Sequence, residues 1–298
     1  MILTMSLPML PPELSSSPLR AVPHQRVDGA ARLVYRGDAD GRTRLADLYQ
    51  RAPCRVLFPD VDAGQPPQAV MLTTSGGLTG GDRLSLHIEA GAGCTLTATT
   101  QAAEKLYRAL PGDAPTRIDI GLRVGDGAWA EWLAQETILF DRSQLRRSLS
   151  ADVAGSGRLL AVESLVFGRT AMGERYDSGT LHDAWRIRCD ERLMWADTLR
   201  LGGDVAAARA QPFGFGTAHA CATLVYVGAD ASALLAPLRE RLAVLGGGVA
   251  ATCIERVLIV RVLADDAPAM RAAVRIAAGA LRAMAGGLPE RLPKVWDC

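Results

Sequence analysis

The sequence predicts a mainly β protein of layered antiparallel or helicoidal β-sheets, with two C-terminal α-helices. Three observations support this prediction. Apolar and polar residues alternate with a period of two over much of residues 30–201, as they do in strands with one buried face. Turn-forming residues recur at short intervals, which suits an antiparallel meander or stacked sheets and not βαβ units. The last third instead combines short apolar runs with helical patterns.

The strands of the first two-thirds are read from this alternation. In residues 84–88, three apolar side chains alternate with polar ones, and the chain then turns at a run of small residues. Further turns are expected at Gly155-Ser156-Gly157 and at Asp190-Glu191. The clearest strands are expected at residues 84–88, 94–98, 118–124 and 129–139.

The last third is expected to hold two strands, at residues 221–227 and 256–263, each followed by a helix. The first helical pattern covers residues 231–245 and contains Pro237. A proline inside a helix removes one backbone hydrogen bond. We therefore expect this helix to begin near Pro237 or to kink there.

The second helical pattern has recognisable ends. Asp266 can accept hydrogen bonds from the first turn, and Pro268 suits a position within that turn. Gly286 can end the helix, with Pro289 just beyond it. One face of the helix is expected to pack on the sheet through Met270, Val274, Ala277, Leu281 and Met284.

Composition excludes several classes of protein. The 298 residues are 49% hydrophobic and 22% charged, as expected of a folded chain. The net charge of +1 offers no positive field for a nucleic acid. Six cysteines, none in a CxxC pair, favour reduced thiols and a cytoplasmic location over a disulfide framework.

No membrane segment or signal peptide is predicted. A membrane helix needs about 18 consecutive apolar residues, and no such stretch occurs. The first residues are apolar, but prolines interrupt them and no basic residue precedes them, which a signal peptide requires. We expect a flexible leader over residues 1–26 and one β-rich domain over residues 27–298.

The most unusual segment is the glycine-rich run TTSGGLTGGDR at residues 73–83. Its glycines Gly76 and Gly81 have the spacing of a P-loop, but Asp82 stands where a phosphate-binding lysine is required. The GxGxxG dinucleotide fingerprint is absent as well. A nucleotide site is therefore excluded, and the loop is interpreted as a turn that positions Asp82.

Local catalytic and metal motifs are also missing. The sequence contains no GxSxG, HxH or HExxH pattern. His219 and Cys221 would share one face of a strand, but no third residue is placed to orient them. Glu163 and Asp197 are carboxylates within apolar runs, where an acid needs a partner, a cavity or a function. The simpler alternative is an ion pair with one of several nearby arginines, Arg158, Arg169 or Arg200.

Five motifs in order resemble the urease accessory protein family UreD, called UreH in some organisms. They are TSGGLTGGDRL, TTQAAEKLYR, EWLAQETILFD, VESLVFGRTAMGE and the closing LPKVW. The resemblance covers residues 30–296 and implies a predominantly β fold with two helices. It also implies a non-enzymatic chaperone that binds urease apoprotein and, with UreF and the GTPase UreG, helps to insert nickel into the urease active site.

The resemblance further implies that Ni²⁺ passes transiently through an internal tunnel, with no tightly bound cofactor. Asp82 matches the acid of the GGD motif, Glu163 stands at a position where relatives carry a carboxylate, and Asp197 lies near an acid of the following strand. Carboxylates suit such a route because they bind Ni²⁺ more weakly than thiolate or imidazole ligands. The expected tunnel-shaping, structural or interface residues are Gly76, Gly77, Gly80, Gly81, Lys105, Tyr107, Arg108, Arg169 and Glu174.

The sequence departs from the family pattern at three places. Thr74-Ser75 precedes the double glycine where relatives often carry proline, and Glu104 replaces a small polar residue. Lys294 stands in place of the usual arginine of the closing motif. Lysine cannot form the planar bidentate contact of arginine, so that contact is expected to be looser here.

Two alternatives remain open. One is a pure assembly module that holds partner proteins together and never touches metal. The other is a hydrolase using a carboxylate pair such as Glu131 and Glu136. These two residues are five apart, so on a strand they would point to opposite faces.

Overall fold

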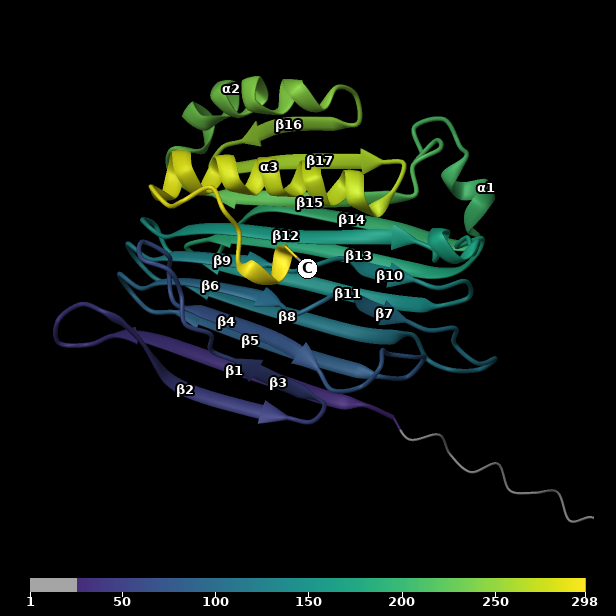
Figure 1. Cartoon of the computed structure of the whole chain (residues 1–298), viewed down its shortest axis with the longest axis horizontal. Coiled ribbons are helices and arrows are strands. Elements are labelled where there is room, and N and C mark those ends of the chain that lie inside the picture. The colour runs from purple at the N-terminus through teal and green to yellow at the C-terminus, as the bar shows by residue number, and fades with distance from the viewer. Residues whose placement is uncertain (1–25, 298) are drawn as a thin grey trace, which may run out of the picture.

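Two stacked β-sheets form the body of the molecule in the computed structural model, which describes residues 26–297 (Figure 1). All but the last residue of the predicted leader lies outside the described residues. The first sheet has seven strands, in the order β14 (Arg192–Asp204), β13 (Ser178–Cys189), β11 (Gln144–Val153), β8 (Thr116–Val124), β5 (Arg83–Ala90), β1 (Asp28–Gly37) and β2 (Thr43–Arg51).

The second sheet has ten strands. Eight follow the order β16 (Val249–Ile254), β17 (Val257–Ala264), β15 (Ala220–Val227), β12 (Arg158–Phe167), β9 (Trp129–Leu133), β6 (Thr95–Thr100), β4 (Gln68–Thr73) and β3 (Cys54–Leu57). The other two are short: β10 (Thr137–Leu139) pairs with both β12 and β7 (Glu104–Leu106). The predicted mainly β, layered fold is confirmed.

The direction of strand pairing differs from an antiparallel meander. From β4 to β13 the chain crosses between the two sheets at almost every turn, so consecutive strands lie in different sheets. Neighbours within a sheet are therefore two crossings apart and run parallel, as β5 does with β8 and β6 with β9. Antiparallel pairs remain toward the sheet edges, for example β1 with β2 and β13 with β14. The result is a helicoidal stack.

The main core lies between the two sheets. The apolar face predicted for residues 84–88 is buried there, while the polar residues between these side chains stay exposed or half-buried. Strand β8 shows the same alternation, with Ile118, Ile120, Leu122 and Val124 buried. Strand β12 differs because it is buried along almost its whole length, since the first sheet covers one face and the C-terminal helices cover the other.

A second core lies between the second sheet and two C-terminal helices, α2 (Ala231–Leu242) and α3 (Ala267–Gly286). In Figure 1 the yellow helix α3 runs across β15 and β17. Helix α2 begins at Ala231 and not near Pro237, so the first of the two expectations is wrong, while a kink at Pro237 stays a prediction. Pro237 lies inside the helix, which continues through it to Leu242.

The ends of α3 agree with the sequence pattern. The Asp266 carboxylate accepts a 2.8 Å hydrogen bond from the Ala269 amide, and the last helical residue is Gly286. Gly287, with φ +62°, then ends the helix in the left-handed region. Within residues 26–297, no helix has the length and apolar character needed to cross a bilayer.

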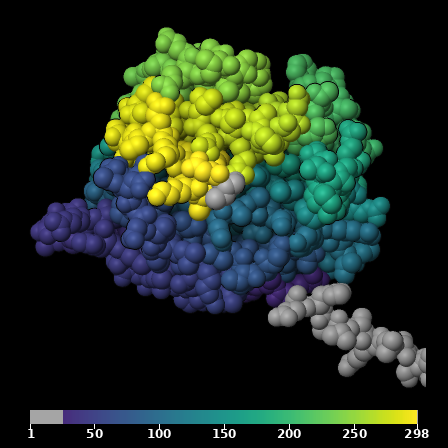
Figure 2. Space-filling view, viewed as in Figure 1, coloured from purple at the N-terminus to yellow at the C-terminus, as the bar shows by residue number. Residues whose placement is uncertain are grey.

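Four short helical elements, the last of them at the chain end, complete the fold. The helix α1 (Val205–Arg209) follows β14 and was not predicted. Single 3₁₀ turns occur at Thr170–Met172, Ala243–Leu245 and Lys294–Trp296. In the space-filling view the yellow C-terminal segment lies against the blue and teal surface of much earlier strands (Figure 2). There the buried indole of Trp296 donates to the Leu133 carbonyl and to the Thr99 hydroxyl.

Candidate functional site

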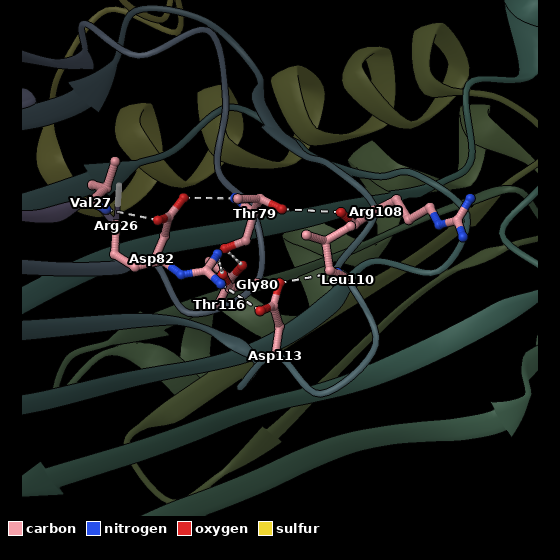
Figure 3. Close-up of polar contacts among 9 residues, drawn as sticks. All are labelled: Arg26, Val27, Thr79, Gly80, Asp82, Arg108, Leu110, Asp113 and Thr116. Atoms are coloured by element: carbon pink, nitrogen blue, oxygen red, sulfur yellow. Dashed lines mark hydrogen bonds and ion pairs between the residues drawn. The ribbon is translucent and has the colours of Figure 1, made fainter. Parts of the chain in front are cut away.

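Asp82 closes the glycine-rich turn that precedes β5. Its Oδ2 atom accepts a 2.8 Å hydrogen bond from the Thr79 amide, and its Oδ1 atom accepts one of the same length from the Val27 amide (Figure 3). The carboxylate is buried. Asp82 therefore ties the glycine-rich loop to the chain segment that enters β1, and both of its oxygens are occupied by backbone donors.

The first glycine pair of the loop packs under an aromatic ring. The Tyr107 hydroxyl donates a 2.6 Å hydrogen bond to the Gly76 carbonyl. Gly77 has φ +147°, and a Cβ atom at this position would lie 2.6 Å from Cε2 of Tyr107 and 2.7 Å from the Lys105 carbonyl oxygen. Only glycine fits this approach without a shift of the neighbouring strand. Tyr107 and Lys105 thus fix the shape of the glycine-rich loop, while their predicted place in a tunnel wall stays a prediction.

The second glycine pair lies on the outer side of the same turn. A Cβ on Gly80 would come within 3.0 Å of Ala109 and Asp113 side-chain atoms, and Gly81 packs beside Arg26 with φ +86°. The Arg26 guanidinium donates to the Gly80 carbonyl and pairs with Asp113. The backbone carbonyl of the nearby Arg108 accepts from the Thr79 hydroxyl, while its guanidinium points away from these groups (Figure 3).

A first cavity of about 260 Å³ lies between the sheets beside this loop. The glycine-rich loop and β7 line part of it, including Gly76, Gly77 and Lys105, and both sheets contribute the remaining wall. Another part of its wall is formed by the guanidinium-bearing Arg147 of β11 and by Glu163 of β12. Asp82 is not among the residues that line this cavity.

A second cavity, of about 280 Å³, continues between the sheets toward β14, β15 and β17. It is lined by two of the predicted carboxylates, Glu163 and Asp197, together with Asp183 of β13. Glu163 therefore borders both cavities. The structure brings Glu163 and Asp197 to one space and leaves Asp82 apart from it.

A buried ion-pair network separates the two cavities. Arg147 donates to Asp183 through Nε (2.9 Å to Oδ1) and Nη2 (2.6 Å to Oδ2), and its Nη1 pairs with Glu163. Nη1 also donates to the Thr137 hydroxyl at 3.1 Å, and the Trp132 indole donates to Oε1 of Glu163 at 2.7 Å. Arg147 and Glu163 side chains are only 2% and 3% exposed, so water does not screen these charges.

Opposing effects act on the pKa values of this network. Burial alone would lower the pKa of Arg147, but the carboxylates of Asp183 and Glu163 outweigh it and raise that pKa. Burial raises the pKa of Glu163, while Arg147 and the Trp132 indole favour its charged form. Arg147 is therefore a permanent cation held between two acids.

Asp197 also pairs with an arginine, at the opposite side of the second cavity. Its Oδ2 atom lies 2.6 Å from Nη2 of Arg261, and the carboxylate remains 31% exposed. Arg261 also donates to the Thr223 hydroxyl and lies over the Trp195 ring. This ion pair, unlike that of Glu163, stands where the cavity meets the surface.

Arg169 and Glu174 lie away from both cavities. They flank the 3₁₀ turn that follows β12 and form an ion pair of 2.6 Å. The Arg169 guanidinium also stacks 4.3 Å above the Phe140 ring, which packs edge-on against Tyr107. These residues shape a surface between loops at one end of the sheets.

The remaining sequence candidates are engaged in other contacts. Glu131 and Glu136 form ion pairs with Arg282 and Arg271 of α3. Burial raises the pKa of the Cys221 thiol to about 12, so it is not an activated thiolate. None of the five cysteines in the described residues forms a disulfide.

The sequence analysis missed Arg147 and Asp183, although a signal was present. Buried positions on β11 and β13 alternate, and Arg147 falls in step with Leu145 and Leu149. Asp183 falls in step with Leu181 in the same way. A charged residue on the apolar face of a strand marks a buried partner or a cavity. Within residues 26–297, no three His, Cys, Asp or Glu side chains converge to hold a metal ion.

Comparisons of the chain with a family model and with individual proteins point to the same family. Residues 27–297 match the model of the family described as UreD urease accessory protein. A urease accessory protein UreD of Magnetococcus marinus is 40% identical over 285 residues, which cover 94% of this chain and 97% of the relative. Proteins of the same name from Rhizobium leguminosarum bv. trifolii and a Methylobacterium species are each 43% identical, covering 92% and 95% of this chain and 96% and 100% of the relative.

Proposed function

The chain belongs to the UreD family of urease accessory proteins, and we propose that it assists the insertion of nickel into the urease active site. In this proposal it acts in the cytoplasm as a non-enzymatic scaffold. It binds urease apoprotein and works in a complex with UreF and the GTPase UreG. Nickel is its cargo and passes through without a resident cofactor.

The observation that carries the proposed route is the position of Glu163. Its carboxyl group borders both intersheet cavities, and Asp197 lies in the second one. An ion entering beside the glycine-rich loop would meet Glu163 first and Asp197 at the far side. Carboxylate oxygens bind a divalent cation weakly enough to release it, which transport requires.

We assign Asp82 a supporting part in this route. Its two hydrogen bonds to backbone amides hold the glycine-rich loop whose Gly76 and Gly77 line the first cavity. Direct contact between Asp82 and the ion stays a prediction. Loss of the Asp82 carboxylate would act on the route through the shape of the loop.

The route is tested by Glu163→Gln and Asp197→Asn, which remove negative charge and nearly preserve shape. Each variant is expressed with the urease and accessory genes, and urease activation is measured together with recovery of the accessory complex. We expect strongly reduced activation with an intact complex. Asp47→Asn, a half-exposed carboxylate on β2 paired with Arg32, is the control and should activate normally. Normal activation by Glu163→Gln would remove Glu163 from the route.

A pure assembly module is the second candidate, and the arginine pairing of both carboxylates favours it. Glu163 and Asp197 are each neutralised by a guanidinium, as purely structural acids would be. Equilibrium dialysis with Ni²⁺ on the chain and on its complex with UreF and UreG separates the two functions. Nickel retention that falls in the Glu163→Gln complex supports transport, and retention by neither sample supports assembly alone.

A further inference from the structure

Arg147 occupies the boundary between the two cavities. It lines the first cavity, Asp183 lines the second, and Glu163 lines both. The guanidinium spans the gap between the sheets, because Arg147 and Asp183 belong to the first sheet and Glu163 to the second. A cation that moves from one cavity to the other past Glu163 would therefore meet this group.

The contacts of Arg147 are unequal on its two sides. Asp183 receives two hydrogen bonds in a bidentate pair, whereas Glu163 is held through the single atom Nη1. The guanidinium can therefore release Glu163 and remain attached to Asp183. Glu163 would stay in place meanwhile, because the Trp132 indole holds its other oxygen.

A divalent cation and a guanidinium compete for the same place. Two carboxylates that face each other in a buried space without a cation would repel strongly, and either cation relieves that repulsion. In the structure the relief comes from Arg147. The guanidinium thus keeps a divalent ion from binding tightly between Glu163 and Asp183. Tight binding there would stop the onward movement of the ion.

We propose that Arg147 is the gate of the passage, and that its guanidinium occupies a divalent cation site formed by Glu163 and Asp183. This inference rests on the proposed function. An arriving ion displaces Nη1 from Glu163, and the return of the guanidinium expels the ion into the next cavity. Arg147 acts through its contact with Glu163 and is a positioning residue for transport.

The test removes the guanidinium and measures nickel retention by the full chain in equilibrium dialysis. Arg147→Met keeps a long apolar stem but leaves Glu163 and Asp183 without a cation. We expect it to retain roughly tenfold more Ni²⁺ than the native chain at the same free concentration. The matched control, R147M with E163Q and D183N, has no charge at this place and should return to native retention.

A merely structural Arg147 predicts a different result. A folded Arg147→Met variant whose nickel retention equals that of the native chain, or a neutral triple variant that retains as much as Arg147→Met, would overturn the gate. If Arg147→Met fails to fold, Arg147→Lys tests the proposal instead. The lysine ammonium is a point charge and cannot bridge both carboxylates as the planar guanidinium does. Arg147→Lys should retain more Ni²⁺ than the native chain, and equal retention would overturn the proposal.

Failure of the gate and failure of the proposed function are distinguishable. The dialysis experiment tests only whether Arg147 occupies a cation site. Urease activation by Glu163→Gln tests whether cargo uses this space at all. If Arg147→Met retains no more nickel than the native chain while Glu163→Gln impairs urease activation, the route is supported and the gate is refuted. If Arg147→Met retains more nickel while Glu163→Gln activates urease normally, the cation site is supported. The route, and with it the gating role of Arg147, is then refuted.

Discussion

The Nε atom of Arg282 lies 2.8 Å from Oε1 of Glu131, and both side chains are fully buried between α3 and the second sheet. Arg282 also donates to the Gln65 side chain and to the backbone carbonyl of Pro289. The Trp129 indole donates to the same Glu131 oxygen. This one pair therefore fastens the C-terminal helix and the segment that follows it to the sheet.

Arg282→Met should lower the free energy of unfolding by about 3–5 kcal/mol, because it leaves a buried carboxylate without its cation. Chemical denaturation of the full chain measures the loss. The double variant R282M/E131Q should be less destabilised than R282M alone. Arg192→Gln, which breaks a well-exposed pair with Glu255, should change the free energy by less than about 1 kcal/mol. Equal effects of the buried and exposed substitutions would contradict this prediction.

Asp82→Ala should destabilise the protein by about 2–3 kcal/mol, since two backbone amides lose a charged acceptor in a buried setting. Denaturation again gives the magnitude. Hydrogen exchange should become faster at the Thr79 and Val27 amides, which donate to Asp82. Asp47→Ala, at a half-exposed acid on β2, is the control and should leave both amides protected. Unchanged exchange at Thr79 and Val27 in Asp82→Ala would show that these two contacts do not hold the turn.

Glu104 makes the stability of the protein depend on pH. Burial raises its pKa from 4.5 to about 7, against the opposing hydrogen bond from the Thr73 hydroxyl. Between these values the native state holds a proton that the unfolded chain has released. This group therefore stabilises the native state fully below about pH 4.5, and the contribution is lost as pH rises through about 7.

Glu104→Gln should remove this dependence. We expect the variant to match the native chain near pH 4 and to exceed its stability by about 3 kcal/mol near pH 8. Denaturation of both proteins at a series of pH values measures the difference, in which the other titrating groups cancel. A difference that stays constant with pH would refute the assignment to Glu104.

Gly77→Ala should distort the wall of the first cavity. The new Cβ would lie 2.6 Å from the Tyr107 ring, and the alanine backbone would have to keep φ +147°. A destabilisation of about 1–3 kcal/mol is therefore expected. Gly37→Ala is the matched control, because nothing lies within 4 Å of its Cβ and its φ is not in the left-handed region. The control should stay within about 0.5 kcal/mol of the native chain. Chemical denaturation of both variants measures their free energies of unfolding, and equal values would contradict the prediction.

Local features of the fold were predictable, and the pairing of strands was not. The buried face of residues 84–88 and the Asp266 cap follow from side-chain direction along a strand and from backbone donors at a helix start. The parallel pairing of β5 with β8 does not follow from either segment. It arises because the short turns lead to the opposite sheet, and a turn's sequence does not show which sheet the next strand joins.

The candidate site shows the same division. Glu163 could be selected from the sequence because an acid stood within an apolar run. Its partner Arg147 belongs to a strand of the other sheet, and Asp183 lies 36 residues from Arg147 along the chain. Asp82 was selected from the glycine-rich turn and the GGD motif, yet the structure places its oxygens on backbone amides.

The amino-acid sequence was sufficient to predict the family, the mainly β character and the inward-facing residues of clear strands such as β5 and β8. These properties depend on motif order and on the alternation of side chains, which are local. The tertiary structure alone decided that Glu163 and Asp197 share a cavity and that a guanidinium stands between Glu163 and Asp183. Such neighbours are set by strand order and by the stacking of two sheets. Burial of the whole core imposes that arrangement, and no single segment encodes it.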